Sequence, residues 1–144
     1  MLKEHPDHLD ADLILKIYDL RREAVMRESR AAINRDYWPR TAEEAVEVQR
    51  PDHPLNRAYR QVNAYWEMVY GMARHGVIHA DFLVENNGEG LFLFARVESF
   101  LGPIREASSP RAFRNTEWVA RETEMGRTLM EGFRTRVAKL LAGK

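Results

Sequence analysis

Four side chains of metal-ligating types lie close together in the sequence, at His75, His79, Asp81 and Glu85. Imidazole and carboxylate groups bind zinc, iron or manganese when they project one turn apart from one face of a helix. Gly76 stands between the two histidines, where it is typical of a helix C-terminus, so the helical face is interrupted. We therefore expect His79 to cap a helix and not to bind a metal, and we predict neither a metal ion nor another cofactor.

Glu67 follows Trp66 within an apolar helical face, so its carboxylate is predicted to be partly buried. A buried carboxylate requires a cation or strong hydrogen-bond donors, and the candidate partners are Arg74, Arg96 and Arg105. Three interpretations are open: a hydrogen-bond or ion-pair network that fixes the register of two helices, a general acid or base with a raised pKa, or exposure to solvent. We favour the network and expect Glu67→Gln to lower the melting temperature.

Asn63 lies one turn before Glu67 and, together with Asn86, could complete a polar seam between two helices. Such a seam either lines a ligand pocket or specifies which helices pair, and we favour pairing. The sequence thus gives a candidate polar network and no candidate catalytic residue. The network comprises Asn63, Glu67, His75 and Arg105.

Motifs for several enzyme classes are absent from the sequence. There is no Gly-x-Ser-x-Gly, no cysteine nucleophile, no Gly-x-x-x-x-Gly-Lys and no Gly-x-Gly-x-x-Gly. The 22 basic and 22 acidic residues balance, which argues against nucleic-acid binding driven by overall charge. Arg111, Arg114 and Arg121 are too dispersed for a DNA-recognition helix, so we expect no nucleic-acid partner.

The stretch 56–105 is predicted to organise the fold as two antiparallel helices, an αα-hairpin. Apolar residues recur every three or four positions across 56–75 and again across 79–101, with Gly76 at the turn between them. The polar patch 86–90 leaves two alternatives. Either its glycines allow a neighbouring backbone to approach a continuous helix, which we favour, or 86–90 is a loop and 91–95 forms a strand.

Further helices are predicted on both sides of this hairpin. One begins at Asp10 or Asp12 and continues to residue 31, and a short one covers 42–49 behind the Thr41 cap. Ser108-Ser109-Pro110 is predicted to open another helix, and the last covers 123–141. The predicted fold is an all-α bundle of five or six helices in a single domain, 1–144, with residues 1–9 disordered.

The start of the sequence has no apolar run, and no window reaches the roughly 20 apolar residues of a membrane-spanning helix. We therefore expect neither a secretory signal nor a membrane partner, and we expect a cytoplasmic location.

Several short motifs resemble the central hairpin of small bacterial all-helical proteins that are classified as domains of unknown function. The resemblance covers about residues 56–106, and it implies an all-α fold and no established activity. Some of those proteins have an apolar N-terminal membrane anchor, which is not found in this sequence. The motifs are Asn63 with Trp66-Glu67, Gly76-Val77-Ile78, Asp81-Phe82 and Phe100-Leu101-Gly102-Pro103-Ile104-Arg105.

Two classes of function follow from these observations. The first is a soluble, non-enzymatic protein-interaction or regulatory module, with a protein partner or with itself as a homodimer. The alternative is a small-molecule-binding protein or helical enzyme with a pocket near Asn63, Glu67, His75 and Arg105.

Overall fold

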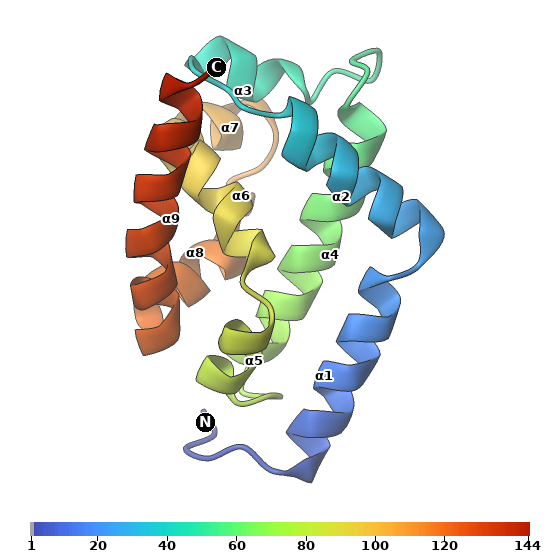
Figure 1. The fold of residues 1–144 in the computed structure, drawn as a ribbon, viewed down its shortest axis with the longest axis vertical. Helices are drawn as coiled ribbons and strands as arrows, with labels where there is room; N and C mark the ends of the chain where they lie inside the picture. Colours follow the sequence, from blue (N-terminus) through green and yellow to red (C-terminus); the bar gives the residue numbers. More distant parts are fainter. Residues whose placement is uncertain (1) are drawn as a thin grey trace.

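The computed structural model describes residues 2–144, and every regular element in that part of the chain is helical, as predicted. Figure 1 shows the arrangement, with α1 and α2 on one side of α4 and α9 on the other. The described residues form more α-helices than the five or six expected, because two predicted long helices are broken and a separate short helix covers residues 101–107. The elements are α1 (His8–Arg21), α2 (Ala24–Asp36), α3 (Ala42–Glu47), α4 (Asn56–Arg74), α5 (Ala80–Asn86), α6 (Glu89–Val97), the 3-10 turn η1 (Glu98–Phe100), α7 (Leu101–Ala107), α8 (Arg114–Glu122) and α9 (Glu124–Ala142).

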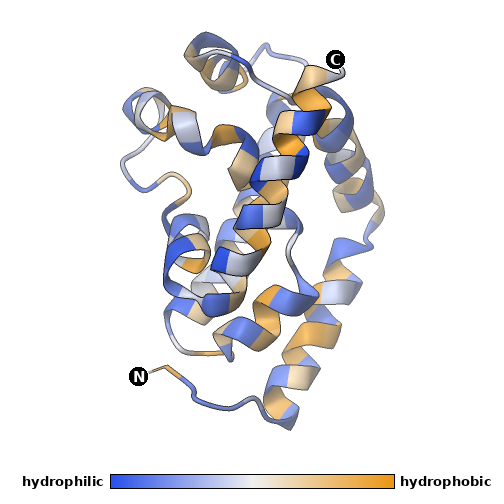
Figure 2. Cartoon of the chain, turned by 60° about the vertical axis from the view of Figure 1, so that its left-hand side comes forward, coloured by the Kyte–Doolittle hydropathy of each residue, from blue (hydrophilic) through white to orange (hydrophobic). Residues whose placement is uncertain are grey.

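The long helix α4 is at the centre of the core. It is strongly amphipathic, and it packs most extensively against α2 and α8, while α9 covers α6. Figure 2 shows the same segregation of apolar and polar residues along the outer helices. Each large apolar side chain that becomes fully buried contributes roughly 1.5–3 kcal/mol, so this core outweighs any single cap. The largest fully buried side chains include Trp66, Tyr59, Tyr70, Phe94 and Phe113.

The predicted turn after α4 is present. Gly76 has a φ of 73°, a left-handed conformation that costs glycine little. His79 then caps α5, since its Nδ1 accepts a hydrogen bond of 3.1 Å from the backbone N–H of Phe82. His79 therefore has the capping position that the sequence predicted.

The prediction of one continuous helix over 79–101 is wrong, because the chain breaks between α5 and α6. Asn87 stabilises the break: its carbonyl accepts a 2.7 Å hydrogen bond from the Tyr70 hydroxyl, and its side-chain oxygen accepts one of 3.0 Å from Arg21. The alternative prediction of a strand at 91–95 is also wrong, since these residues lie within α6. Gly90 does allow a close approach, but of the Trp66 and Tyr70 side chains and not of the neighbouring backbone that was predicted.

The predicted helix over 10–31 is likewise two helices. Asp7, and not Asp10 or Asp12, caps α1, and Asp10 completes a capping box with it. The chain then turns at Arg22, and the carboxylate of Glu23 accepts hydrogen bonds of 3.0 Å from the backbone N–H groups of Val25 and Met26. Glu23 thus caps a new helix, α2, at a point where apolar periodicity alone predicts that the first helix continues.

The helix predicted to open at Ser108-Ser109-Pro110 begins later, at Arg114. Residues 108–113 form a loop instead, in which the Ser109 hydroxyl accepts a hydrogen bond from the backbone N–H of Arg111. Phe113, just before α8, has a φ of 60° and is fully buried. Burial of this ring stabilises a left-handed conformation that a phenylalanine rarely adopts.

Asp10 anchors the N-terminal segment. Its buried carboxylate accepts hydrogen bonds from Lys3 Nζ, 3.0 Å away, and from the backbone N–H groups of Asp7 and His79, at 2.8 and 3.1 Å. The expectation that residues 1–9 are disordered stays a prediction, and Met1 lies outside the described residues.

These contacts predict a pH-dependent contribution to stability. Burial alone would raise the pKa of Asp10, but the hydrogen bonds from Lys3, Asp7 and His79 outweigh burial and hold the pKa below its usual value. The charged carboxylate therefore stabilises the fold above the unfolded-state pKa of about 4, and this contribution is lost as pH falls through the lower folded-state pKa. Asp10→Asn is expected to melt below wild type at pH 7, with the difference shrinking below about pH 4. Thermal melts across this pH range test it, with the exposed Asp12→Asn as control; a difference independent of pH would contradict the assignment.

Candidate functional site

Glu67 lies on α4 and caps the N-terminus of α8. Its carboxylate accepts hydrogen bonds of 3.0 Å from the backbone N–H of Asn115, 2.8 Å from that of Thr116 and 2.6 Å from the Thr116 hydroxyl. The side chain of Asn115 in turn donates to the Glu67 carbonyl. A helix N-terminus carries unpaired N–H groups and a positive partial charge, so the donors that this carboxylate requires come from a helix and not from an arginine.

A cleft lies where the second half of α4 faces the loop 108–113 and the start of α8. Its volume is about 360 Å³. Behind α6 in the view of Figure 1, α4 and α8 pack closely together. Across the cleft, Arg74 Nη1 lies 3.4 Å from the side-chain oxygen of Asn115. The lining residues are Glu67, Arg74, His75, Arg111, Arg114 and Asn115.

The cleft is positively charged. Among residues 2–144, no carboxylate lies within 4.0 Å of the guanidinium nitrogens of Arg74, Arg111 or Arg114. The carboxylate that lines the cleft, that of Glu67, is already bound to the α8 N-terminus. Arginine stays protonated in proteins, so three permanent cations surround a space whose acidic group is engaged.

Two of the four predicted network residues, Glu67 and His75, line this cleft, and the other two do not. Arg105 lies behind the loop: its Nε donates to the Ala112 carbonyl at 3.0 Å and its Nη2 to Glu117 at 3.0 Å. Asn63 Oδ1 is buried with no hydrogen-bond partner in the described chain. Arg105 thus positions the segment that carries Arg111. That the four residues form one functional polar network stays a prediction.

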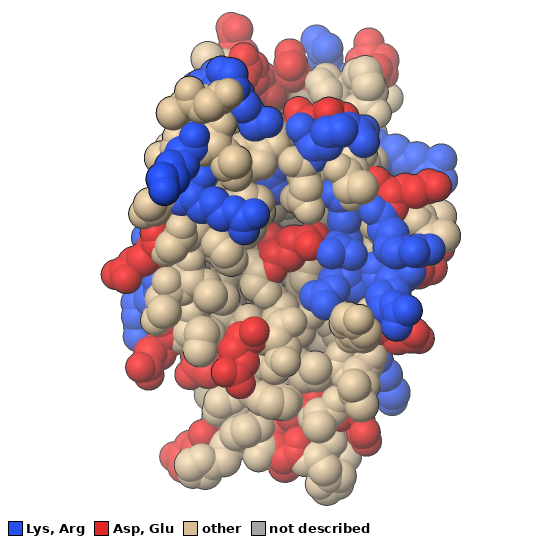
Figure 3. Space-filling view, in the orientation of Figure 1, with Lys and Arg blue, Asp and Glu red and all other residues tan. Residues whose placement is uncertain are grey.

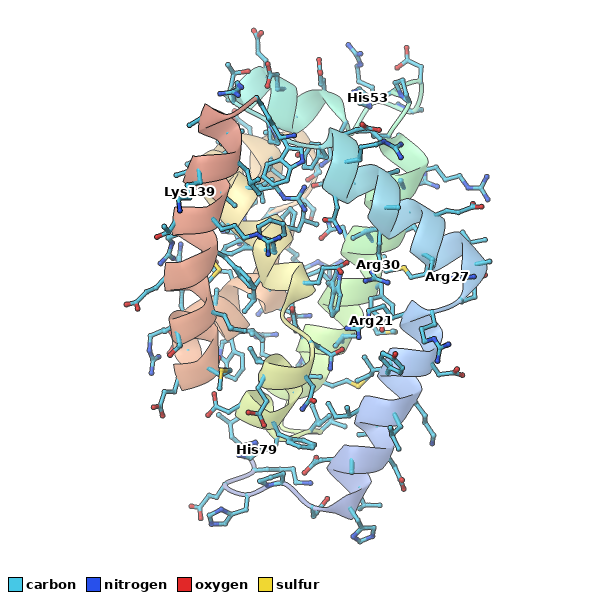
Figure 4. The ribbon with its side chains drawn as sticks, in the orientation of Figure 1. Arg21, Arg27, Arg30, His53, His79 and Lys139 are labelled. Carbon is cyan, nitrogen blue, oxygen red and sulfur yellow. The ribbon has the colours of Figure 1, made fainter. Side chains whose placement is uncertain are left out.

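The predicted seam between Asn63 and Asn86 is not formed. Asn86 is exposed, and its side chain donates to the Phe82 carbonyl of its own helix. The polar junction between the helices lies instead at Asn87 and at a bidentate pair in which Arg30 donates to Glu89 at 2.7 and 2.6 Å. Figure 4 shows Arg21 and Arg30 beside this junction. Arg30 and Glu89 neutralise each other and Arg21 donates to the Asn87 side chain, so the junction is a structural contact.

Arg96, another predicted partner of Glu67, is buried elsewhere. It donates to the Ile33 and Tyr37 carbonyls at 3.0 and 2.8 Å, at the C-terminus of α2. Its guanidinium also lies over the ring of Trp38, 4.6 Å from the centroid. Burial lowers the pKa of Arg96 to about 10. Arg96 therefore caps α2, because a cation is stabilised by the carbonyl end of a helix.

Two of the four metal-ligating side chains near the turn, those of Asp81 and His79, cap helices. Asp81 Oδ1 accepts a 2.9 Å hydrogen bond from the backbone N–H of Met125 at the start of α9, and His79 caps α5. Figure 4 shows His79 facing the N-terminal segment. Within residues 2–144, no group of three His, Asp or Glu side chains converges.

Sequence reasoning missed Arg111, Arg114 and Asn115 as a cluster. The two arginines precede and begin α8, and the left-handed Phe113 between them sets how the loop joins the helix. A phenylalanine gives no signal for that conformation, so the sequence offered no reason to group these side chains with Arg74.

One family model matches residues 6–123, from just before α1 to the residue after α8, and its description is "Domain of unknown function (DUF4760)". No curated protein and no solved structure matches the chain. Across residues 2–144, no helix combines the length and the apolar character that crossing a membrane requires.

Proposed function

The chain belongs to the DUF4760 family, and from its geometry we propose a non-enzymatic protein-interaction module that binds an acidic or phosphorylated side chain of a partner protein in the cleft between α4 and α8. The observation that carries this proposal is the set of arginines at the cleft, Arg74, Arg111 and Arg114, none of which has a carboxylate partner in the described chain. Arginine pairs with carboxylate and phosphate groups through two parallel hydrogen bonds, and clusters of arginine are a recurrent means of recognising acidic or phosphorylated motifs.

The other groups around the cleft support binding over chemistry. Glu67 is occupied in capping α8, and Arg105 in holding the loop. Glu67 and Arg105 therefore stabilise the helix and the loop that carry Arg111 and Arg114. A preorganised wall lowers the entropic cost of binding.

The polar lining of the cleft, and not its size, favours a charged side chain over a whole small molecule. Pockets for small molecules span roughly 300–1,000 Å³ and are mostly apolar. This cleft has about 360 Å³, and its lining residues are all polar or charged. The alternative, a small-molecule-binding protein or enzyme with its pocket near Asn63, Glu67, His75 and Arg105, retains two of those residues at the cleft.

Arg111→Gln combined with Arg114→Gln is expected to weaken binding of a phosphoserine-containing acidic peptide at least tenfold. Each charge-assisted hydrogen bond contributes about 1.5–3 kcal/mol, and 1.4 kcal/mol corresponds to a factor of ten. Fluorescence anisotropy with a labelled peptide measures the affinity, and raising the salt concentration should weaken it.

The matched control is Arg57→Gln combined with Arg60→Gln, which removes the same charge from exposed positions elsewhere on α4. An equal loss of affinity in both double variants would mean non-specific attraction and would refute the proposal. Tight binding of inorganic pyrophosphate that displaces the peptide would favour the small-molecule alternative.

Other expectations stay predictions beside this proposal. They are a homodimer, a cytoplasmic location and the lack of a nucleic-acid partner.

A further inference from the structure

A second hollow surface lies between α3 and α7, at the upper end of the molecule in Figure 1. It consists of two adjoining depressions of about 550 and 340 Å³ that share Glu43, Val46 and Ala107. Because three lining residues are common to both, the depressions form one continuous groove. It is separate from the cleft between α4 and α8 and shares no residue with it.

The floor and the rim of this groove differ in character. Ala42 and Val46 of α3 and Pro103 and Ala107 of α7 supply apolar surface. The carboxylates of Glu43 and Glu47 stand one turn apart on α3, and that of Glu106 stands on α7. The lining thus combines apolar contact area with acidic groups from both helices.

The sequence explains why acidic residues gather here. Thr41 caps α3, and carboxylates in the first turn of a helix, such as Glu43 and Glu44, are stabilised by its dipole. Figure 3 shows acidic side chains gathered at this end of the molecule, over α3.

The groove is negatively charged overall. Arg50 lies at one end and pairs with Asp52 at 3.6 Å, and Glu47 lies 3.7 Å from His53 Nε2. In the described part of the chain, neither Glu43 nor Glu106 has a cation within 4.0 Å. A ligand that brought its own cations would therefore gain attraction on both sides of the groove.

We propose that this groove binds a basic segment of a partner protein that carries lysine or arginine together with leucine-like side chains. Apolar side chains would cover Val46, Pro103 and Ala107, while ammonium or guanidinium groups reach the three carboxylates. Lysine and arginine suit such a site, because their aliphatic stems lie along apolar surface while their charged ends stay at the rim. The inference rests on two features of the groove, its unpaired carboxylates and its apolar floor. It is independent of the arginine cleft.

The test uses a labelled synthetic peptide of about four helical turns, with lysine and leucine at helical spacing. Fluorescence anisotropy is expected to show binding that weakens at least tenfold when Glu43→Gln, Glu47→Gln and Glu106→Gln are combined, since three charge pairs are lost. Ala107→Phe, which keeps every charge and fills the exposed floor, should weaken it similarly. The control combines Glu28→Gln, Glu85→Gln and Glu122→Gln, exposed glutamates on other helices, and should change affinity less than twofold. Thermal melts check that each variant folds.

Two companion peptides make the proposal refutable. Replacing every leucine by serine should abolish binding, and replacing every lysine by glutamate should do so too. Unchanged binding of either peptide, or equal loss in the control variant, would overturn the proposal. If light scattering shows self-association that Ala107→Phe disrupts, a second copy of the chain occupies the groove and the proposal is wrong.

Discussion

Glu67→Ala is expected to lower the free energy of unfolding by about 2–3 kcal/mol, among the largest effects available outside the apolar core. The variant loses three hydrogen bonds to a carboxylate and leaves the N–H groups of Asn115 and Thr116 uncapped. Loss of a helix cap alone costs about 0.5–2 kcal/mol, and unpaired buried donors add about 1–3 kcal/mol. At roughly 2–4 °C per kcal/mol for a chain of this length, the melting temperature should fall by about 4–12 °C. Glu67→Gln, which keeps an oxygen acceptor, should cost less.

Differential scanning calorimetry and amide hydrogen exchange test this prediction together. The amides of Asn115 and Thr116 should exchange faster in Glu67→Ala, because they lose their acceptor. Glu85→Ala removes an exposed glutamate from α5 and should leave both measurements nearly unchanged. If Glu67→Ala melts like wild type, its carboxylate is solvated and the cap does not stabilise the fold.

The sequence predicted that the Glu67 carboxylate requires hydrogen-bond donors, but it did not predict which residues supply them. A carboxylate beside Trp66 on an apolar face requires donors, and that much follows from helical periodicity. Its donors lie on α8, whose start was predicted too early because Pro110 is a favourable first residue of a helix. The buried, left-handed Phe113 delays the helix to Arg114, and the energy of burying that ring depends on the whole fold.

The helix breaks show the same limit of local reasoning. Apolar periodicity continues across Arg22 and Glu23 and across Asn87, so it predicts helix in both places. The chain breaks where polar side chains find better partners, Glu23 on the α2 N-terminus and Asn87 on Tyr70 and Arg21. Element type was therefore predictable from pattern, whereas boundaries depended on hydrogen bonds that only the folded chain supplies.

The candidate site was predictable only in part, for a related reason. Glu67 and His75 belong to one helix and its end, so their neighbourhood could be inferred from spacing. Arg111 and Arg114 reach the cleft through a loop that Arg105 holds from behind. Local sequence carries little information about loop conformation. Residues that a loop brings together therefore cannot be identified from sequence motifs.

Gly90→Ala is expected to lower the free energy of unfolding by about 2–4 kcal/mol, the second large effect. An added Cβ would lie 2.6 Å from Tyr70 Cε2 and 2.8 Å from both Trp66 Cγ and the Tyr70 hydroxyl. Both rings are fully buried and stacked on each other, so neither can move freely. Overpacking of a core typically costs about 1–3 kcal/mol. Displacing Tyr70 would also strain its hydrogen bond to the Asn87 carbonyl, and an unpaired buried acceptor costs about 1–3 kcal/mol more.

Gly132→Ala is the matched control and should change stability in the opposite direction. Gly132 lies within α9, and an added Cβ would meet nothing within 4 Å. Alanine is favoured over glycine in a helix interior by about 1 kcal/mol, so this variant should melt slightly above wild type. Urea denaturation of the two variants measures both signs in one experiment. If Gly90→Ala were as stable as wild type, α6 would not approach α4 as closely as this packing requires.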